Sequence, residues 1–231
     1  LSRFAGGGHM EVIIKGISKS YKDATGESFA VIKDLVLELK SGAVLRLKGA
    51  SGSGKTTLMN IVSGLILPDS GTVKAGDFEI TAMSETGRDR FRAENIGYVF
   101  QTFNLLSPFS VIENVYAPLA FAGKLPEKFE EKAIAVLNEV GLAGLEKRKI
   151  YHLSVGQRQR VCVARVLFSN PRIILADEPT ASLDTESAKT VYRSIEKCRN
   201  NGSTIIFASH DRIFDDFNSD MVFDLETGRV S

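Results

Sequence analysis

The chain has 231 residues, of which 43% are hydrophobic and 25% are charged, ordinary values for a globular protein that exclude a disordered or fibrous chain. Lys and Arg number 29 against 28 Asp and Glu, so the formal net charge of +1 attracts the chain neither to nucleic acid nor to anionic lipid. The two cysteines, Cys162 and Cys198, are too few for a disulfide framework or a zinc motif. No segment approaches the ~18 consecutive apolar residues that cross a bilayer, so we expect no direct bilayer insertion.

The first ten residues differ in character from the rest. Residues 1–10 combine a glycine run with His-Met just before the first apolar segment, which is typical of an expression scar or linker. A native flexible N-terminus is the alternative. We expect residues 11–231 to form a single domain.

Short apolar runs alternate with helical patterns from residue 11 onward. The predicted strands are, in chain order, 12–14, 36–39, 44–47, 71–73, 78–80, 96–100, 173–176, 204–208 and 221–223. The runs at 173–176 and 204–208 are apolar throughout, as in parallel strands that are buried on both faces. The runs at 71–73 and 78–80 flank Ala75-Gly76-Asp77 and predict a hairpin.

Helical patterns dominate between residues 84 and 169. Pro126 stands where a first helical turn would begin, and apolar residues follow at helical spacing up to Gly141. The simplest interpretation is an α/β core, about 11–102 and 168–231, with an α-helical subdomain of about 103–167 inserted in it.

One segment carries a complete phosphate-binding motif. Residues 49–56 read G-A-S-G-S-G-K-T, which matches G-x-x-x-x-G-K-[ST], and stand between a predicted strand and a helical stretch. The glycines let successive backbone N–H groups face phosphate oxygens, Lys55 reaches the β- and γ-phosphates, and the Thr56 hydroxyl is placed to ligate Mg²⁺. The residues expected to bind the nucleoside triphosphate are Gly49, Ser51, Gly52, Ser53, Gly54, Lys55, Thr56 and Thr57.

Two carboxylates follow the buried run 173–176. Asp177 stands at the carboxyl end of a predicted strand, where open parallel sheets bind their ligands, and is expected to hold Mg²⁺ through water. Glu178 is expected to face the γ-phosphate as the general base or as the group that positions water. The alternative is a strand that simply exits into polar surface residues.

These motifs resemble those of the ABC-transporter ATPases. Leu153-Ser154-Val155-Gly156-Gln157 is similar to the family's signature motif, and Gln101, Ser182-Leu183-Asp184 and His210 stand in the family's order around it. The resemblance covers essentially all of residues 11–231. It implies a P-loop NTPase core with a mostly parallel sheet, an antiparallel β subdomain and an inserted α-helical subdomain, and it implies ATP and Mg²⁺ as cofactors.

The resemblance also implies roles for single residues. Gln101 would ligate Mg²⁺ and sense the γ-phosphate, and His210 would contact the γ-phosphate and orient the attacking water with Glu178. Tyr21 is the expected platform for adenine, with a packed core tyrosine as the alternative.

The signature segment is expected to act across a dimer. Ser154 has N-cap chemistry at the start of a helix, and with Gly156 it forms a second anion cradle. The resemblance implies that this cradle and Gln157 complete the ATP site of a second copy, with Asp184 lying across the interface. An ordinary helix cap is the alternative for Ser154. Val155 departs from the family, in which glycine is common, and we expect the site to tolerate it if the side chain faces away from phosphate.

The segment Gln101–Leu119 is expected to meet a membrane partner. It is rich in apolar residues, namely Phe103, Leu105, Leu106, Phe109, Val111, Val115 and Leu119. In the family this region receives a short cytoplasmic helix of the permease subunit, a helix-in-groove contact. About half of these side chains would instead belong to the core of the subdomain.

We therefore expect an ATP-hydrolysing subunit that dimerises around two Mg-ATP and powers a permease, held at the cytoplasmic face of the inner membrane by that partner. Segments 100–106 and 176–180 resemble the branch that serves lipoprotein release, macrolide or peptide export, and cell division. The alternatives are a mechanotransmitting or signalling ATPase that moves no substrate, and an assembly module with negligible hydrolysis. An ABC ATPase that acts on ribosomes or DNA is disfavoured by the missing basic excess. A whole subunit and a cassette of a longer polypeptide both remain open.

Overall fold

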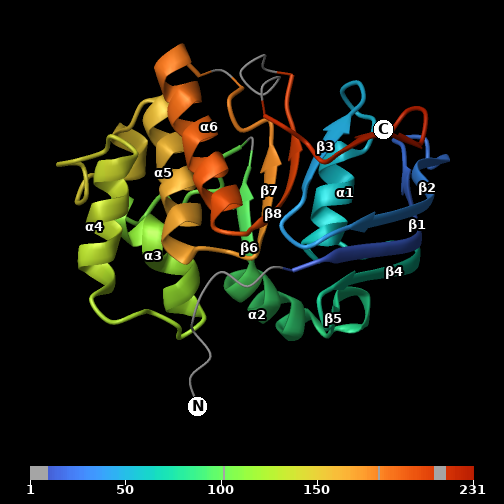
Figure 1. The fold of residues 1–231 in the computed structure, drawn as a ribbon, viewed down its shortest axis with the longest axis horizontal. Coiled ribbons are helices and arrows are strands. Elements are labelled where there is room, and N and C mark those ends of the chain that lie inside the picture. Colours follow the sequence, from blue (N-terminus) through green and yellow to red (C-terminus); the bar gives the residue numbers. More distant parts are fainter. Residues whose placement is uncertain (1–9, 101, 182, 211–216) are drawn as a thin grey trace.

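The computed structural model describes residues 10–100, 102–181, 183–210 and 217–231. Of the predicted site residues, Gln101 lies outside these ranges, as do Ser182 and the segment 1–9. Two β-sheets and a set of helices lie side by side along the long axis of the molecule (Figure 1). Met10, at the edge of the described chain, is buried, and its carbonyl accepts a hydrogen bond of 2.6 Å from the Thr204 hydroxyl.

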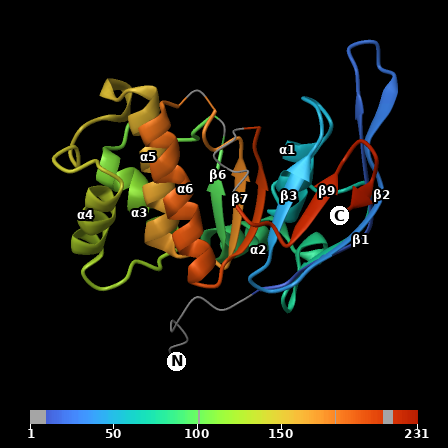
Figure 2. The ribbon, with the colours of Figure 1, turned by 45° about the horizontal axis from the view of Figure 1, so that its top comes forward.

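The first sheet is antiparallel, with the strand order β2-β1-β4-β5. Its strands are β1 (Val12–Lys22), β2 (Ser28–Leu39), β4 (Ser70–Ala75) and β5 (Phe78–Glu79). The predicted strands 12–14 and 36–39 are the paired ends of β1 and β2, and both strands continue into a hairpin that projects beyond the other elements (Figure 2). The predicted hairpin of β4 and β5 is confirmed, with Ala75 opposite Phe78.

The second sheet has the strand order β10-β9-β3-β8-β7-β6, and all its neighbours are parallel except β10 and β9. Its strands are β3 (Val44–Lys48), β6 (Ile96–Val99), β7 (Ile173–Asp177), β8 (Thr204–Ala208), β9 (Met221–Asp224) and β10 (Arg229–Val230). The prediction that 221–223 forms the last strand was wrong, since two residues of β10 are too short to show a period. Because β3, β6, β7 and β8 run in parallel, their carboxyl ends meet at one edge.

The helices are α1 (Lys55–Val62), α2 (Glu85–Asn95), α3 (Val111–Phe121), α4 (Phe129–Glu139), α5 (Val155–Ser169) and α6 (Thr185–Asn200), with 3₁₀ turns η1 (Ile80–Ala82) and η2 (Ile150–His152). The predicted helical start at Pro126 was wrong, because α4 begins at Phe129. Lys128 has a left-handed backbone with φ of 54°, which cannot continue a helix. The predicted helical segment 103–167 contains α3, α4 and all but the last two residues of α5.

The six-stranded sheet separates α1 from α5 and α6 in both views (Figures 1 and 2). Its apolar side chains alternate between two cores, so that Ile174 of β7 packs with the helices α3 to α6 and Ile173 packs with α1 and the antiparallel sheet. None of the helices in the described ranges has the length and apolarity that a membrane crossing requires.

Candidate nucleotide-binding site

The phosphate-binding motif occupies the turn between β3 and α1. Gly49, Gly52 and Gly54 have φ of 138°, 83° and 102°, values in the left-handed region. At Gly49 a Cβ atom would lie 2.4 Å from Ser53 Oγ, so this position of the curl excludes any side chain. Because α1 has no side-chain cap, its first backbone N–H groups are not occupied by a capping oxygen and are suited to an anion.

The Lys55 side chain lies inside the phosphate-binding loop. It is buried, and Nζ donates hydrogen bonds of 2.6 Å to the Gly49 carbonyl and 2.8 Å to the Ala50 carbonyl. The ammonium group therefore adds a full positive charge to the ring of loop amides. Of the other predicted residues of this loop, Ser51 is exposed, whereas Ser53 and Thr57 are half-buried.

Thr56, in the first turn of α1, and Asp177, at the end of β7, are brought together. The Thr56 hydroxyl donates a hydrogen bond of 2.5 Å to Asp177 Oδ2, and the Asp177 carboxylate is buried at the last position of β7. A hydroxyl and a carboxylate side by side are the hard oxygen donors that Mg²⁺ prefers, so the pair fits the predicted ion. In the described ranges no group of three or more His, Cys, Asp or Glu side chains can hold a metal by itself.

Glu178 and His210 face each other at the ends of β7 and β8. His210 Nε2 lies 3.6 Å from Glu178 Oε1, and the His210 backbone N–H donates to Glu178 Oε2 at 3.3 Å. Glu178 has a left-handed backbone with φ of 46°, which is uncommon for a residue with a side chain. In this conformation the Glu178 N–H donates to the Ala208 carbonyl at 2.9 Å, and the Glu178 carboxylate reaches His210. The strained position thus assembles the two groups, as such outliers do at functional sites.

The signature segment begins α5 with a capping box. Ser154 Oγ accepts a hydrogen bond of 3.2 Å from the Gln157 N–H, and the Gln157 amide oxygen accepts one of 3.0 Å from the Ser154 N–H, so the predicted N-cap is confirmed. Val155 is the first helical residue and its side chain is exposed. Since its φ is not positive, the β-branched side chain meets no backbone strain there.

Asp184 caps α6 beside the signature segment. Its carboxylate accepts hydrogen bonds from the Ser187 N–H at 2.9 Å and the Ser187 hydroxyl at 2.8 Å, and these bonds lower the pKa of Asp184. A Cβ atom at Gly156 would lie 3.0 Å from Ser187 Oγ and 3.5 Å from Asp184 Oδ2. The small residue at 156 therefore lets the starts of α5 and α6 approach closely.

Tyr21 lies near the tip of the projecting hairpin. It pairs with Phe29 of β2, its ring centroid lies 6.4 Å from that of Phe29, and Lys19 Nζ stands 5.8 Å from the ring centre. The ring is partly exposed, so a packed core tyrosine does not describe it. The contacts of Tyr21 lie in the antiparallel sheet, whereas the phosphate-binding loop (the P-loop, residues 49–57) follows β3 of the six-stranded sheet.

Two polar residues were missed by sequence reasoning. Gln159 of α5 is buried, and its amide donates a hydrogen bond of 2.7 Å to the Pro179 carbonyl, next to Glu178. Glu226, beyond β9, accepts a hydrogen bond of 2.5 Å from the Ala50 N–H of the P-loop. For Gln159, the sequence does offer a signal, because a glutamine stands among apolar residues on one face of the helix. Nothing local marks the second, because the contact joins residues far apart in sequence.

Comparison with known proteins assigns a family to this arrangement. The ABC transporter family model matches residues 32–181. The lipoprotein-releasing system ATP-binding protein LolD of Idiomarina loihiensis is 39% identical over 85% of this chain and 86% of its own length. The macrolide export ATP-binding/permease protein MacB of Campylobacter jejuni is also 39% identical, over 87% of this chain but 30% of its own length. A solved dimeric structure of the ATP-binding cassette MJ0796 in a post-hydrolysis state, bound to ADP and Pi, superposes with a TM-score of 0.87 at 32% identity, over 95% of this chain and 97% of that one.

Proposed function

The chain belongs to the ABC transporter family as an ATP-hydrolysing cassette, and on that basis we propose which of its residues carry the reaction and what the reaction drives. The P-loop, Gly49–Thr57, is the proposed triphosphate site, and Tyr21 is the proposed platform for adenine. The observation that carries the proposal is the meeting of three strand ends, since β3 leads to Lys55, β7 ends in Asp177 and leads to Glu178, and β8 leads to His210.

Hydrolysis is proposed to be an in-line attack of water on the γ-phosphorus. The bond to the β-phosphate oxygen breaks, and Glu178 accepts the proton of the attacking water or holds that water in line. His210 steadies the Glu178 carboxylate through the contact of 3.6 Å and faces the γ-phosphate. Lys55 and the loop amides stabilise the charge that spreads over the phosphoryl oxygens in the transition state.

Mg²⁺ is the proposed metal, and this chain would hold it through Thr56, Asp177 and Gln101, the last of which lies outside the described residues. When bound with ATP, the ion would neutralise negative charge on the β- and γ-phosphate oxygens.

The working form is proposed to be a head-to-tail pair of chains. The signature segment at the start of α5 and the P-loop at the start of α1 stand on opposite sides of the six-stranded sheet (Figure 1). The two segments of one chain thus lie apart, and we propose that the signature segment of a second chain completes each nucleotide site. Ser154, Gly156, Gln157 and Asp184 would complete the site of the second copy, and the dimeric cassette MJ0796 supports this arrangement.

The driven partner is proposed to be a permease that exports or extracts lipoprotein, peptide or drug-like substrates, as the names of the relatives LolD and MacB suggest. Of the apolar residues predicted to meet it, Val111 and Val115 are buried in the core, whereas Leu106 is exposed and Phe109 lies 6.1 Å from the exposed Phe121. This patch of Leu106, Phe109 and Phe121 is the proposed docking face, and it would hold the chain at the cytoplasmic face of the membrane.

The variant Glu178→Gln tests the reaction. It should bind ATP as the native chain does, release phosphate at a small fraction of the native rate, and accumulate as a dimer in size-exclusion chromatography with ATP. Glu186→Gln, the same change on the exposed first turn of α6, is the matched control and should hydrolyse ATP normally. Near-native phosphate release by Glu178→Gln would remove Glu178 from this role.

A further inference from the structure

The helix that follows the P-loop ends at a glycine that turns the chain. Ser63 caps α1, and Gly64 follows with φ of 69°; the Gly64 N–H donates to the Ile61 carbonyl at 3.0 Å, and the Leu65 N–H donates to the Asn60 carbonyl at 2.9 Å. The helix has eight residues, so this end lies only about 12 Å from the end that faces the phosphates. Because so short a helix moves as a unit, contacts that hold its carboxyl end in place also hold its amino end in place.

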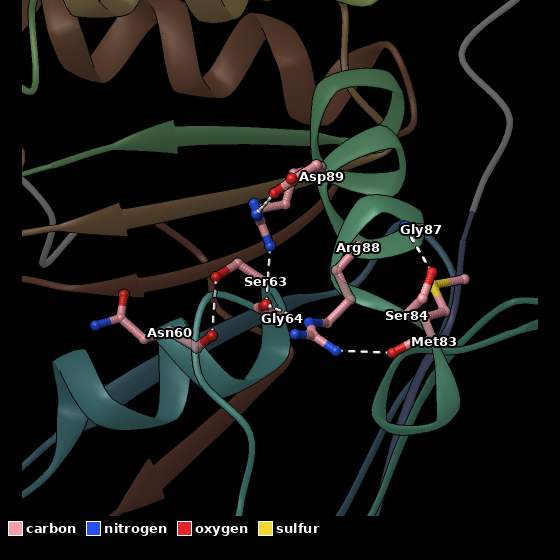
Figure 3. Close-up of polar contacts among 9 residues, drawn as sticks. Asn60, Ser63, Gly64, Met83, Ser84, Gly87, Arg88 and Asp89 are labelled. Atoms are coloured by element: carbon pink, nitrogen blue, oxygen red, sulfur yellow. Dashed lines mark hydrogen bonds and ion pairs between the residues drawn. The ribbon is translucent and has the colours of Figure 1, made fainter.

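Two arginines of α2 hold the Gly64 carbonyl. Arg88 Nε donates to it at 3.1 Å (Figure 3), and Arg92 Nη1 donates to it at 2.8 Å, so a single oxygen accepts two charged hydrogen bonds. Arg88 Nη1 also donates to the Met83 carbonyl at 2.7 Å, and Arg92 is paired with Asp89. Gly64 is buried and both arginines are half-buried, so these contacts are partly shielded from water.

The position of Gly64 leaves no room for a side chain. A Cβ atom there would lie 2.8 Å from Ile80 Cγ2 and 3.0 Å from Arg88 Cδ, and the positive φ independently favours glycine. A side chain at residue 64 would have to displace Ile80 or Arg88, so the glycine favours the close approach of the carbonyl and the Arg88 guanidinium group.

The charges complement the helix itself. The last turn of α1 has no basic residue, so the helix itself supplies no positive charge to the partial negative charge at its carboxyl end. Arg88 and Arg92 supply two positive charges at that end. Neither touches the Thr56, Asp177, Glu178 or His210 groups described above.

We propose that Arg88 and Arg92 are positioning residues of the nucleotide site, which act by fixing the carboxyl end of α1 so that its amino end presents the P-loop amides to phosphate. This inference rests on the proposed triphosphate site at Gly49–Thr57. It predicts that losing the two arginines weakens ATP binding and leaves the chemical step largely intact, because no group at the γ-phosphate is changed.

The test compares Arg88→Gln, Arg92→Gln and the double variant with Arg90→Gln. Arg90 lies on the same helix with an exposed side chain, so it provides the same loss of charge without the contact. The measurements are the dissociation constant of ATP with Mg²⁺, KM, kcat and Tm. The double variant should bind ATP about tenfold more weakly with kcat within about twofold, and Arg90→Gln should bind like the native chain.

Lysine variants keep the test decisive if the glutamine variants fold poorly. Arg88→Lys and Arg92→Lys retain a charged donor at Gly64 and should restore part of the ATP affinity that the glutamine variants lose. An unchanged ATP affinity in the folded double variant, an equal loss in Arg90→Gln, or a fall in kcat with an unchanged KM would each overturn the inference. Failure of the native chain to bind ATP would instead contradict the proposed function.

Discussion

The Thr56 hydroxyl and the Asp177 carboxylate are joined by a hydrogen bond of 2.5 Å, which connects the first turn of α1 to the last residue of β7. Both side chains offer oxygen to a hard cation; Asp177 ends β7, whereas Thr56 follows β3 across residues 49–54 of the phosphate-binding loop. The distance between the two donors therefore depends on the order of the strands, in which β8 lies between β3 and β7, and on the conformation of that loop.

The first prediction concerns this pair. Thr56→Val preserves the shape of the side chain but removes the hydroxyl, so the gain in ATP affinity that Mg²⁺ gives the native chain should fall by about tenfold or more. ATP affinity measured in EDTA should not change. Thr86→Val, an exposed threonine of α2, is the control and should keep the full effect of Mg²⁺ in the same titrations. A native response to Mg²⁺ in Thr56→Val would exclude Thr56 as a ligand.

The second prediction separates a helix cap from a catalytic cradle. Ser110 and Ser154 form the same capping box at the starts of α3 and α5, so replacing either by alanine should lower the free energy of unfolding by about 1 kcal/mol. Only Ser154→Ala should also lower ATP hydrolysis by the otherwise native chain, and only Ser154→Ala should lower dimer formation when it is combined with Glu178→Gln. Equal ATPase rates for the two variants in phosphate-release assays would reduce Ser154 to a cap.

The third prediction concerns Val155, which stands where the family commonly has glycine. Because Val155 is helical and exposed, Val155→Gly should leave ATP hydrolysis within about twofold of the native rate and lower Tm slightly. Steady-state kinetics and a melting curve measure both. A large stimulation of hydrolysis would show that the valine side chain obstructs the site.

The fourth prediction tests the docking face. Phe121 is 71% exposed, so Phe121→Ser should leave basal ATP hydrolysis within about twofold of native and abolish the stimulation by the permease. Ile134→Ser, a partly exposed apolar residue of the neighbouring helix α4, is the control. Equal stimulation of Phe121→Ser and native protein by the reconstituted permease would move the docking face elsewhere.

The fifth prediction follows from the two cysteines. Burial raises the pKa of Cys162 to about 11 and the pKa of Cys198 to about 12, above the value of about 8.5 for a free thiol. At about pH 8 the thiolate fraction is therefore far smaller in the folded chain than in the unfolded one, and it rises only as the pH approaches the raised values. Neither thiol should react with a disulfide reagent within minutes in the native state, and both should react in denaturant. Rapid reaction of the native chain at this pH would contradict the burial of these residues.

The sequence predicted those parts of the fold that local patterns determine. The apolar runs of β7 and β8 and the glycine-rich curl after β3 each carry their own signal, so the strand ends and the groups on them were located correctly. The outer halves of β1 and β2 were not predicted, because their side chains near Tyr21 and Phe29 are exposed or half-buried and show no alternation.

Contacts between distant segments were beyond prediction for another reason. The bond from Gln159 to the Pro179 carbonyl and the bonds from Arg88 and Arg92 to Gly64 depend on how the helices pack, and no spacing within one segment encodes them. The start of α4 was misplaced because the left-handed backbone of Lys128 has no marker in the sequence, such as glycine or asparagine.

The alternation of Ile173, Ile174, Leu175 and Ala176 between two cores bears on how such a chain can evolve. Substitutions within α3 and α4, which carry none of the proposed nucleotide-site residues, alter the packing on one face of the sheet only. The contacts that hold α1 and the P-loop lie on the other face and keep their geometry. Partner recognition can therefore diverge between descendants of one ancestor while the machinery that handles the nucleotide is inherited unchanged.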